Sequence, residues 1–344
     1  MNFLNDRYTL RLADSGDNEG IRLIFESGGF DGGLSVQYLR GESPMESFQA
    51  DGEEAKVLVI IDNNEHRTAA VGGSVIRKEY LNGKIEDCAY LTGLKVHPDY
   101  RGRINFLTRA YQLMGEILSD CRCVYTTILD DNTPVIKMLE KKRRNMPEYR
   151  YLGHYTTYCF HGGKKILPLE KNNREGFQNL LDTYFLKLNF TPADTEYPGL
   201  GEKDFYCVRD EHGEITACCF VGDQSRYKQY KMCSYGGVYK LLSKLPTRLA
   251  GYPAFPKAGE VIKHGAVSYL YVKDNDPGLC SRFLRSVAAE AEFSLLIWGG
   301  FESHPLCPAL DKMKTVRYGS RLYEVVWDKA SGVSGQIGME AAVL

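Results

Sequence analysis

The chain has 344 residues, of which 43% are hydrophobic and 25% charged, a globular composition that excludes a disordered or collagenous protein. At about 150 residues per domain, this length predicts two domains. Lysine plus arginine (43) nearly balances aspartate plus glutamate (44), for a formal net charge of -1, so no bulk basic field exists to hold nucleic acid. The start of the chain carries Asp6 and Arg7 and no apolar run follows. We therefore expect a cytoplasmic protein without a membrane partner.

Ten cysteines lie mostly within apolar stretches, and no Cys-x-x-Cys pair is present. In a chain long enough to form a large core, they are expected to be buried, reduced thiols. His97, His154 and His304 have no neighbouring partner in the sequence. The sequence therefore predicts no metal site.

Hydrophobic periodicity in the first half predicts strands and helices in a mixed order. In chain order we expect a strand over 8–12, a helix over 17–27, strands over 56–62, 69–79 and 87–96, a helix over 104–118, a strand over 123–129, a helix over 135–142 and a strand over 154–160.

The second half repeats the last part of that order. We expect strands over 205–209, 215–222 and 267–272, a helix over 279–292, a strand over 294–298, a helix over 308–314 and a strand over 321–327. The run Gly-Gly-Lys-Lys at 162–165 is the expected linker. These features predict domains at 1–162 and 163–330, followed by a flexible tail over 331–344, which lacks periodicity.

One motif carries the most chemical information. Between a predicted strand and a predicted helix, the segment YLTGLKVHPDYRGRINFLTRAYQLM contains Val96, Pro98, Tyr100, Arg101 and Gly102 in that order. The downstream segment DDNTPVIKMLEKK has an asparagine after the next strand, followed by a helix. In these residues and in its element order, the chain resembles the GNAT superfamily of N-acyltransferases over residues 8–160, and the second half looks like a degenerate copy.

The resemblance implies an α+β fold of two GNAT-like domains, each a mixed, mostly antiparallel sheet flanked by helices. It also implies acetyl-CoA as cosubstrate, with its pyrophosphate at the free N–H groups of a helix N-terminus and its pantetheine arm added along a splayed strand. Asn132 would reach the pantetheine; alternatively it caps the next helix. The implied cofactor-binding residues are Leu94, Lys95, Val96, Arg101, Gly102, Arg103, Ile104, Asn105 and Asn132.

The motif departs from the family pattern at two positions. The family continues with Arg-x-x-Gly-x-Gly or Ala, whereas Ile104 and Phe106 occupy the small-residue positions here. Side chains there would crowd a phosphate, unless Gly102 takes over the close approach. The alternative is a surface Arg-Gly turn that leads into an ordinary amphipathic helix.

Catalysis in the family is direct attack of an amine on the acyl thioester, assisted by a base and often by a tyrosine that protonates the thiolate. The resemblance places Tyr90 where many members carry a base glutamate, although a phenol with a pKa of about 10 is a poor base. Glu86, Asp87 and Asp130 are alternatives. Leu139 stands at the usual tyrosine position, so Tyr155 or Tyr158 would substitute. The candidate catalytic residues are thus Tyr90, Asp130 and Tyr158; for each tyrosine the alternative is a core or rim aromatic.

The sequence therefore predicts an acetyl-CoA-dependent N-acyltransferase that acts on a small-molecule or peptide amine. The alternative is a non-catalytic, GNAT-like ligand-binding or interaction protein. Residues 236–266 form a glycine- and proline-rich insertion, expected to be a loop with one short helix. We expect it to line the acceptor pocket through Tyr239, Tyr252 or Phe255; alternatively it is a surface loop packed on its own domain.

Overall fold

The structure, a computed structural model, describes residues 2–3, 5–28, 34–102, 106–162 and 165–344. The first half contains β1 (Asn2–Phe3), β2 (Tyr8–Leu12), α1 (Asn18–Glu26), β3 (Leu34–Leu39), α2 (Pro44–Ala50), β4 (Glu54–Asp62), β5 (Arg67–Leu81), β6 (Lys84–Val96), α3 (Leu107–Ile117), β7 (Cys123–Leu129), α4 (Thr133–Leu139) and β8 (Glu148–Phe160). The second half contains β9 (Glu170–Lys171), α5 (Phe177–Thr183), β10 (Glu202–Arg209), β11 (Ile215–Asp223), β12 (Gln229–Tyr235), α6 (Tyr239–Leu242), β13 (His264–Val272), α7 (Pro277–Glu290), β14 (Leu295–Phe301), α8 (Cys307–Asp311) and β15 (Val316–Val326).

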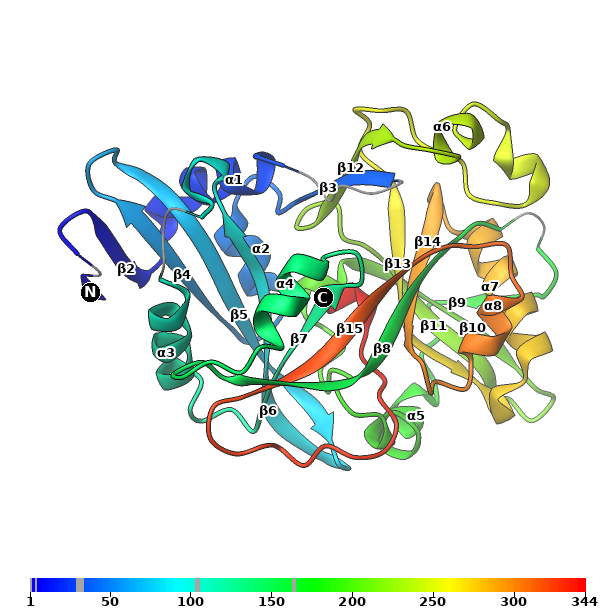
Figure 1. Ribbon diagram of the computed structural model, residues 1–344. Helices are drawn as coiled ribbons and strands as arrows, with labels where there is room; N and C mark the ends of the chain where they lie inside the picture. Colours follow the sequence, from blue (N-terminus) through cyan, green and yellow to red (C-terminus); the bar gives the residue numbers. More distant parts are fainter. Residues whose placement is uncertain (1, 4, 29–33, 103–105, 163–164) are drawn as a thin grey trace.

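Thirteen of these strands form one sheet that runs through the molecule (Figure 1). Its order is β1-β2-β4-β5-β6-β7-β15-β8-β14-β13-β11-β10-β9. Two neighbouring pairs, β6–β7 and β13–β14, are parallel, and the others are antiparallel. This mixed, mostly antiparallel sheet with flanking helices confirms the predicted fold class.

The two halves exchange their last strands. β8, from the first half, pairs with β14 and β15 of the second half, and β15 pairs with β7 of the first. The hydrogen-bonded ladder is therefore continuous from one half to the other.

Successive side chains along β4 point to opposite faces of the sheet, and each face is covered by helices. Leu58 and Ile60 pack in one apolar cluster with side chains from α3 and α4, whereas Val57 and Val59 pack in another with α1 and α2. In the second half, α7 and α8 cover a separate cluster on β11, β13 and β14.

Most predicted elements are present, and the strands over 8–12 and 123–129 have the predicted bounds. The elements that the sequence did not predict include β3, β12, α2 and α5. β3 and β12 pair with each other as a separate two-stranded sheet, and their short, partly polar sequences carry little periodic signal.

The tail differs from its prediction. Residues 331–344 were expected to be flexible, but Met339, Ala342 and Val343 are almost completely buried. The carbonyls of Gly338 and Met339 accept hydrogen bonds from Thr191 Oγ1 (2.9 Å) and Tyr155 Oη (3.1 Å). An aperiodic segment can still be ordered when tertiary contacts satisfy its backbone.

All ten cysteines are free and seven are buried, which agrees with the expected reduced thiols. Among the described residues, no helix is both long and apolar enough to cross a bilayer.

Candidate functional site

The parallel strands β6 and β7 separate soon after they meet. Their ladder consists of three pairs, from Cys88 opposite Cys123 to Tyr90 opposite Tyr125, while β6 continues to Val96. Thr126 Oγ1 donates to the Leu91 carbonyl oxygen (2.8 Å) at the point of divergence. Beyond it, the β7-facing edge of β6 can pair with an extended ligand.

A bulge lies within the diverging part of β6. The register with β5 shifts between Val71 and Gly73, and Gly93 has a φ of +70°. A Cβ atom at Gly93 would lie 2.8 Å from the Phe48 ring, so both the left-handed backbone and the close packing require glycine. Bulges of this kind redirect the side chains and N–H groups of a strand, and the next residue, Leu94, is 47% exposed.

A buried arginine that the sequence analysis missed lies beside this bulge. The Arg40 guanidinium carbon is 3.7 Å from the Phe48 ring centroid, and its Nη2 donates to Thr92 Oγ1 (3.2 Å). Arg40 is 1% exposed, and its Nε has no hydrogen-bond partner in the described part of the chain. A cation is therefore held next to the diverging strand.

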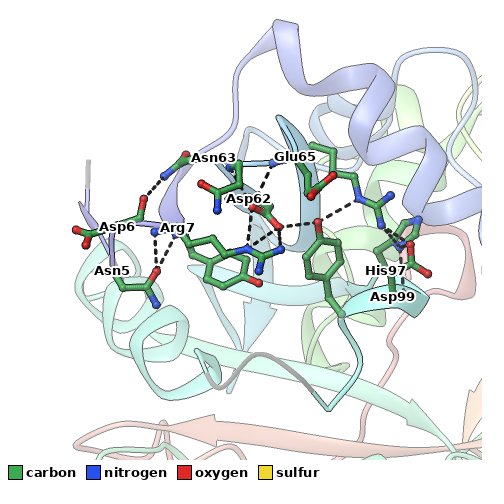
Figure 2. Close-up of polar contacts among 12 residues, drawn as sticks. Asn5, Asp6, Arg7, Asp62, Asn63, Glu65, His97 and Asp99 are labelled. Carbon is green, nitrogen blue, oxygen red and sulfur yellow. Dashed lines mark hydrogen bonds and ion pairs between the residues drawn. The ribbon is translucent and has the colours of Figure 1, made fainter.

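A polar network anchors the Arg-Gly turn that follows β6 (Figure 2). Tyr100, in the 3₁₀ turn Pro98–Tyr100, donates from its hydroxyl to Asp62 Oδ2 (2.9 Å). Arg7 donates to the same carboxylate (2.7 Å), and Arg67 Nε donates to Tyr100 Oη (3.2 Å). The hydrogen bond from Arg7, which has the largest effect, and that from Tyr100 hold the pKa of Asp62 well below its usual range.

Arg101 and Gly102 follow this anchored turn and are exposed. Arg101 Nε contacts the Val96 carbonyl oxygen at 3.4 Å, and Gly102 has a φ of +71° with open space where a Cβ would stand. The structure thus places Arg101 at the end of the diverging strand. Arg103, Ile104 and Asn105 were also predicted to bind the cofactor, and they lie outside the described residues.

Lys95 points from β6 to the end of α1. Its Nζ donates to the carbonyls of Phe25 and Gly28 (both 2.8 Å). Burial, with a smaller effect of the Arg101 charge, lowers its pKa to about 8. Cations are favoured at the C-terminus of a helix, so Lys95 ties α1 to the candidate site.

Asn132 is the N-cap residue of α4, three positions after the last residue of β7. Its carbonyl accepts from the N–H groups of Val135 and Ile136 (both 3.1 Å). The position of Asn132 at the N-cap agrees with the alternative that it caps the helix, although its side chain makes no cap hydrogen bond. The amide is half-buried at the end of the strand that borders the divergence.

The three predicted catalytic residues have separate partners. Tyr90 is buried beside the divergence, with its hydroxyl 2.7 Å from Thr127 Oγ1, and burial raises its pKa. Asp130 follows β7 and pairs with His154 (Oδ2 to Nε2, 2.6 Å). Tyr158 stacks on Trp298 in the second-half core, where its hydroxyl donates to Asp311 (3.1 Å), and burial raises its pKa. The structure does not bring Tyr158 together with Tyr90.

The Asp130–His154 pair was not visible in the sequence because its members are 24 residues apart. Both side chains are partly exposed. The two side chains lie over Gly319 of β15. A Cβ atom added at Gly319 would lie 2.0 Å from Asp130 Oδ2 and 2.4 Å from His154 Nε2, so the pair needs a glycine at this position. Only strand exchange brings this glycine beneath the pair.

Buried charges also lie behind Tyr90. Arg77 donates to Glu79 Oε1 (2.6 Å) and to the Tyr125 hydroxyl (2.8 Å), and all three side chains are inaccessible. Lys228 pairs with Asp51 (2.7 Å), and burial lowers the lysine pKa to about 8. Charged residues of this kind are seldom buried unless paired, and the sequence offered no pattern by which to find them.

A second divergence repeats the geometry of the first. β13 and β14 also pair over three positions, starting at His264, and Tyr269 has a φ of +50°. Tyr269 stands five residues after the first parallel pair, as Gly93 does in β6. Here the tail fills the space: Ile337 to Glu340 line a remaining cavity of about 10 Å³, and Glu340 Oε1 accepts from the Tyr269 N–H (2.8 Å).

Solved structures resemble this architecture along nearly the whole chain. Saccharomyces cerevisiae N-myristoyltransferase with bound myristoyl-CoA is similar over 99% of this chain and 89% of that chain, with a TM-score of 0.59 and 11% identity. A GCN5-related N-acetyltransferase from Anabaena variabilis is similar over 96% of this chain and 75% of its own, with a TM-score of 0.54 and 11% identity.

The chain has the GNAT fold. No protein-family model and no curated protein matches the sequence, so the likeness lies in the structure. In terms of the GNAT fold, the candidate active site consists of the diverging strands β6 and β7, the bulge at Gly93 and the Arg101-Gly102 turn. The resemblance that the sequence showed around Val96 and Asn132 is confirmed at the level of the fold.

Proposed function

We propose that this protein is an N-acyltransferase that moves an acyl group from acyl-CoA to an amine, with the acyl-CoA held between β6 and β7. The observation that carries this proposal is the edge of β6 beyond its three-pair ladder, which pairs with no strand among the described residues and contains the Gly93 bulge. An extended pantetheine arm contains amides that can pair with such an edge. The myristoyl-CoA and acetyltransferase neighbours support the same class of cosubstrate.

In this proposal the predicted cofactor residues have distinct roles. The backbone of Leu94 and Val96 binds the pantetheine arm, the Asn132 amide reaches it from the N-terminus of α4, and Lys95 holds the strand against α1. Arg101 and Gly102 bind the pyrophosphate together with the predicted residues 103–105. Acetyl-CoA is the cosubstrate that we propose, and a small-molecule or peptide amine is the acceptor.

We assign the proton transfers to two of the predicted groups. Asp130 with His154 can accept the proton of the attacking ammonium group, because both side chains are partly exposed and the hydrogen bond between Asp130 Oδ2 and His154 Nε2 (2.6 Å) couples the imidazole to a carboxylate. Tyr90, whose hydroxyl lies 2.7 Å from Thr127 Oγ1 of β7, is the proposed proton donor to the thiolate. Arg40 would stabilise the negative charge that develops on the thioester oxygen. Tyr158 has no proposed role, since it is buried in the second-half core.

Calorimetry with Arg101→Ala tests the cosubstrate site. Removing a charge-assisted contact to phosphate is expected to weaken acetyl-CoA binding by about 10- to 100-fold, equivalent to about 1.5–3 kcal/mol. Arg282→Ala, which removes an exposed arginine from α7 in the other half, is the matched control and should leave the affinity unchanged.

Release of the CoA thiol, followed with a panel of amines, tests the reaction. Binding of acetyl-CoA without amine-dependent thiol release would favour a non-catalytic ligand-binding protein. Tighter binding of myristoyl-CoA than of acetyl-CoA would reassign the acyl group. An unchanged affinity in Arg101→Ala would remove the Arg-Gly turn from the proposed site.

A further inference from the structure

Exposed apolar side chains are concentrated in one segment of the chain. Among the described residues, twelve large hydrophobic side chains are exposed, and five of them lie between positions 238 and 261: Val238 (62%), Leu241 (69%), Leu245 (58%), Tyr252 (40%) and Val261 (48%). This part of the chain, with α6, projects away from the thirteen-stranded sheet at the upper right of Figure 1. Clustered exposed apolar groups mark interaction surfaces more often than single ones do.

The three most exposed side chains lie in or beside α6, which is a single helical turn. Val238 and Leu241, at spacing i and i+3, lie on the same side of this turn, and Leu245 follows it three residues after Leu242. Helical hydrogen bonds link the segment: Leu241 N–H donates to the Val238 carbonyl and Lys244 N–H to the Leu241 carbonyl (both 3.1 Å). We call residues 236–257 the basic loop.

The charge of this region has one sign. Residues 224–259 contain seven lysines and arginines and no aspartate or glutamate, in a chain whose net charge is -1. The four exposed cations of the basic loop form no ion pair within the described part of the chain: Lys240, Lys244, Arg248 and Lys257. Exposed cations and exposed apolar side chains therefore occur together in one projecting segment.

The basic loop is held by contacts within itself, with Tyr235 of β12 and with Lys314, whose Nζ donates to the Ala250 carbonyl (2.6 Å). Phe255 packs against Tyr235 and Tyr239, with ring centroids 5.7 and 6.1 Å apart. Thr247 Oγ1 donates to the Pro253 carbonyl (2.7 Å). Aromatic packing inside the loop leaves Leu241 and Leu245 outside it. The surface is thus formed before any partner binds, and Leu241 and Leu245 lie exposed on it.

We propose that the basic loop docks the protein on an anionic lipid bilayer. Apolar side chains enter the boundary between headgroups and acyl chains, while flanking lysines and arginines neutralise anionic headgroups. A second copy of this chain would place the same cations against each other, and nucleic acid would leave the apolar face in water. The contact is peripheral and does not depend on the proposed acyl transfer.

Co-sedimentation of the full chain with vesicles tests this proposal. With phosphatidylcholine vesicles that contain about 30% phosphatidylglycerol, at about 0.1 M salt, we expect the protein to pellet, and we expect release at about 0.5 M salt. Leu241→Ser with Leu245→Ser should weaken the partitioning at least tenfold, and so should Lys240→Glu with Lys244→Glu. Leu23→Ser with Ile85→Ser removes two exposed apolar side chains elsewhere and should leave the partitioning unchanged.

Three outcomes would overturn the proposal. They are the absence of pelleting with anionic vesicles, equal pelleting with pure phosphatidylcholine, and unchanged partitioning in both loop variants. Sedimentation velocity identifies a competing occupant: a dimer that the two leucine substitutions dissociate, without vesicle binding, would assign the face to a second copy of the chain. Circular dichroism of each variant confirms that the fold is intact.

Discussion

Glu340, which lies where β13 and β14 diverge, makes the stability of this protein depend on pH. Glu340 is 5% exposed and accepts the Tyr269 N–H through Oε1 (2.8 Å). Burial raises its pKa from 4.5 to about 8, so the folded protein keeps a proton that the unfolded chain releases. The free energy of unfolding therefore falls as the pH rises through this window.

The loss of free energy of unfolding follows from the difference between the pKa values of Glu340 in the unfolded and folded protein. A shift of about 3.5 pKa units is equivalent to at most about 5 kcal/mol, and the part between pH 6 and pH 8 is about 2 kcal/mol. Glu340→Gln keeps a carbonyl oxygen for the Tyr269 N–H but has no titrating proton. Relative to the unsubstituted protein, this variant should gain about 2 kcal/mol between these pH values.

Urea unfolding at about pH 6, 7 and 8 measures this difference directly, because the other titrating groups are common to both proteins. Glu211→Gln, at a side chain that is 88% exposed, should show no such gain. If the stabilities of the unsubstituted protein and Glu340→Gln run parallel across the pH range, Glu340 is not held as a neutral acid and the reasoning is refuted.

Two further substitutions test the geometry of the first divergence. Gly93→Ala should lower the free energy of unfolding in urea by about 2–4 kcal/mol, because it adds a strained backbone and a clash with Phe48. The control is Gly83→Ala: Gly83 has a φ of +76° and open space around it, so this variant should lose only the part that comes from backbone strain. Equal losses in the two variants would contradict the proposed packing. Asp130→Asn should lower kcat by at least tenfold with little change in the acetyl-CoA Kd, and a loss confined to binding would remove the proposed base.

Local patterns in the sequence were sufficient for most of the framework. The alternating and helical spacings predicted 8–12 and 123–129 with the observed bounds, because apolar periodicity reports directly on which side of an element is buried. The Val96 to Gly102 motif indicated the fold and located the strand that diverges. A strand followed by an Arg-Gly turn and a helix is a local feature, and local features survive in a linear sequence.

Tertiary structure alone decided the composition of the site. The exchange of β8 and β15 places Gly319 beneath Asp130 and His154, and no residue in the neighbouring sequence of this histidine indicates the pair. The tail carries no periodicity, yet it enters the second divergence and buries Glu340 there. Contacts between residues far apart in sequence depend on the register and order of strands, and hydrophobic spacing within a single element contains neither.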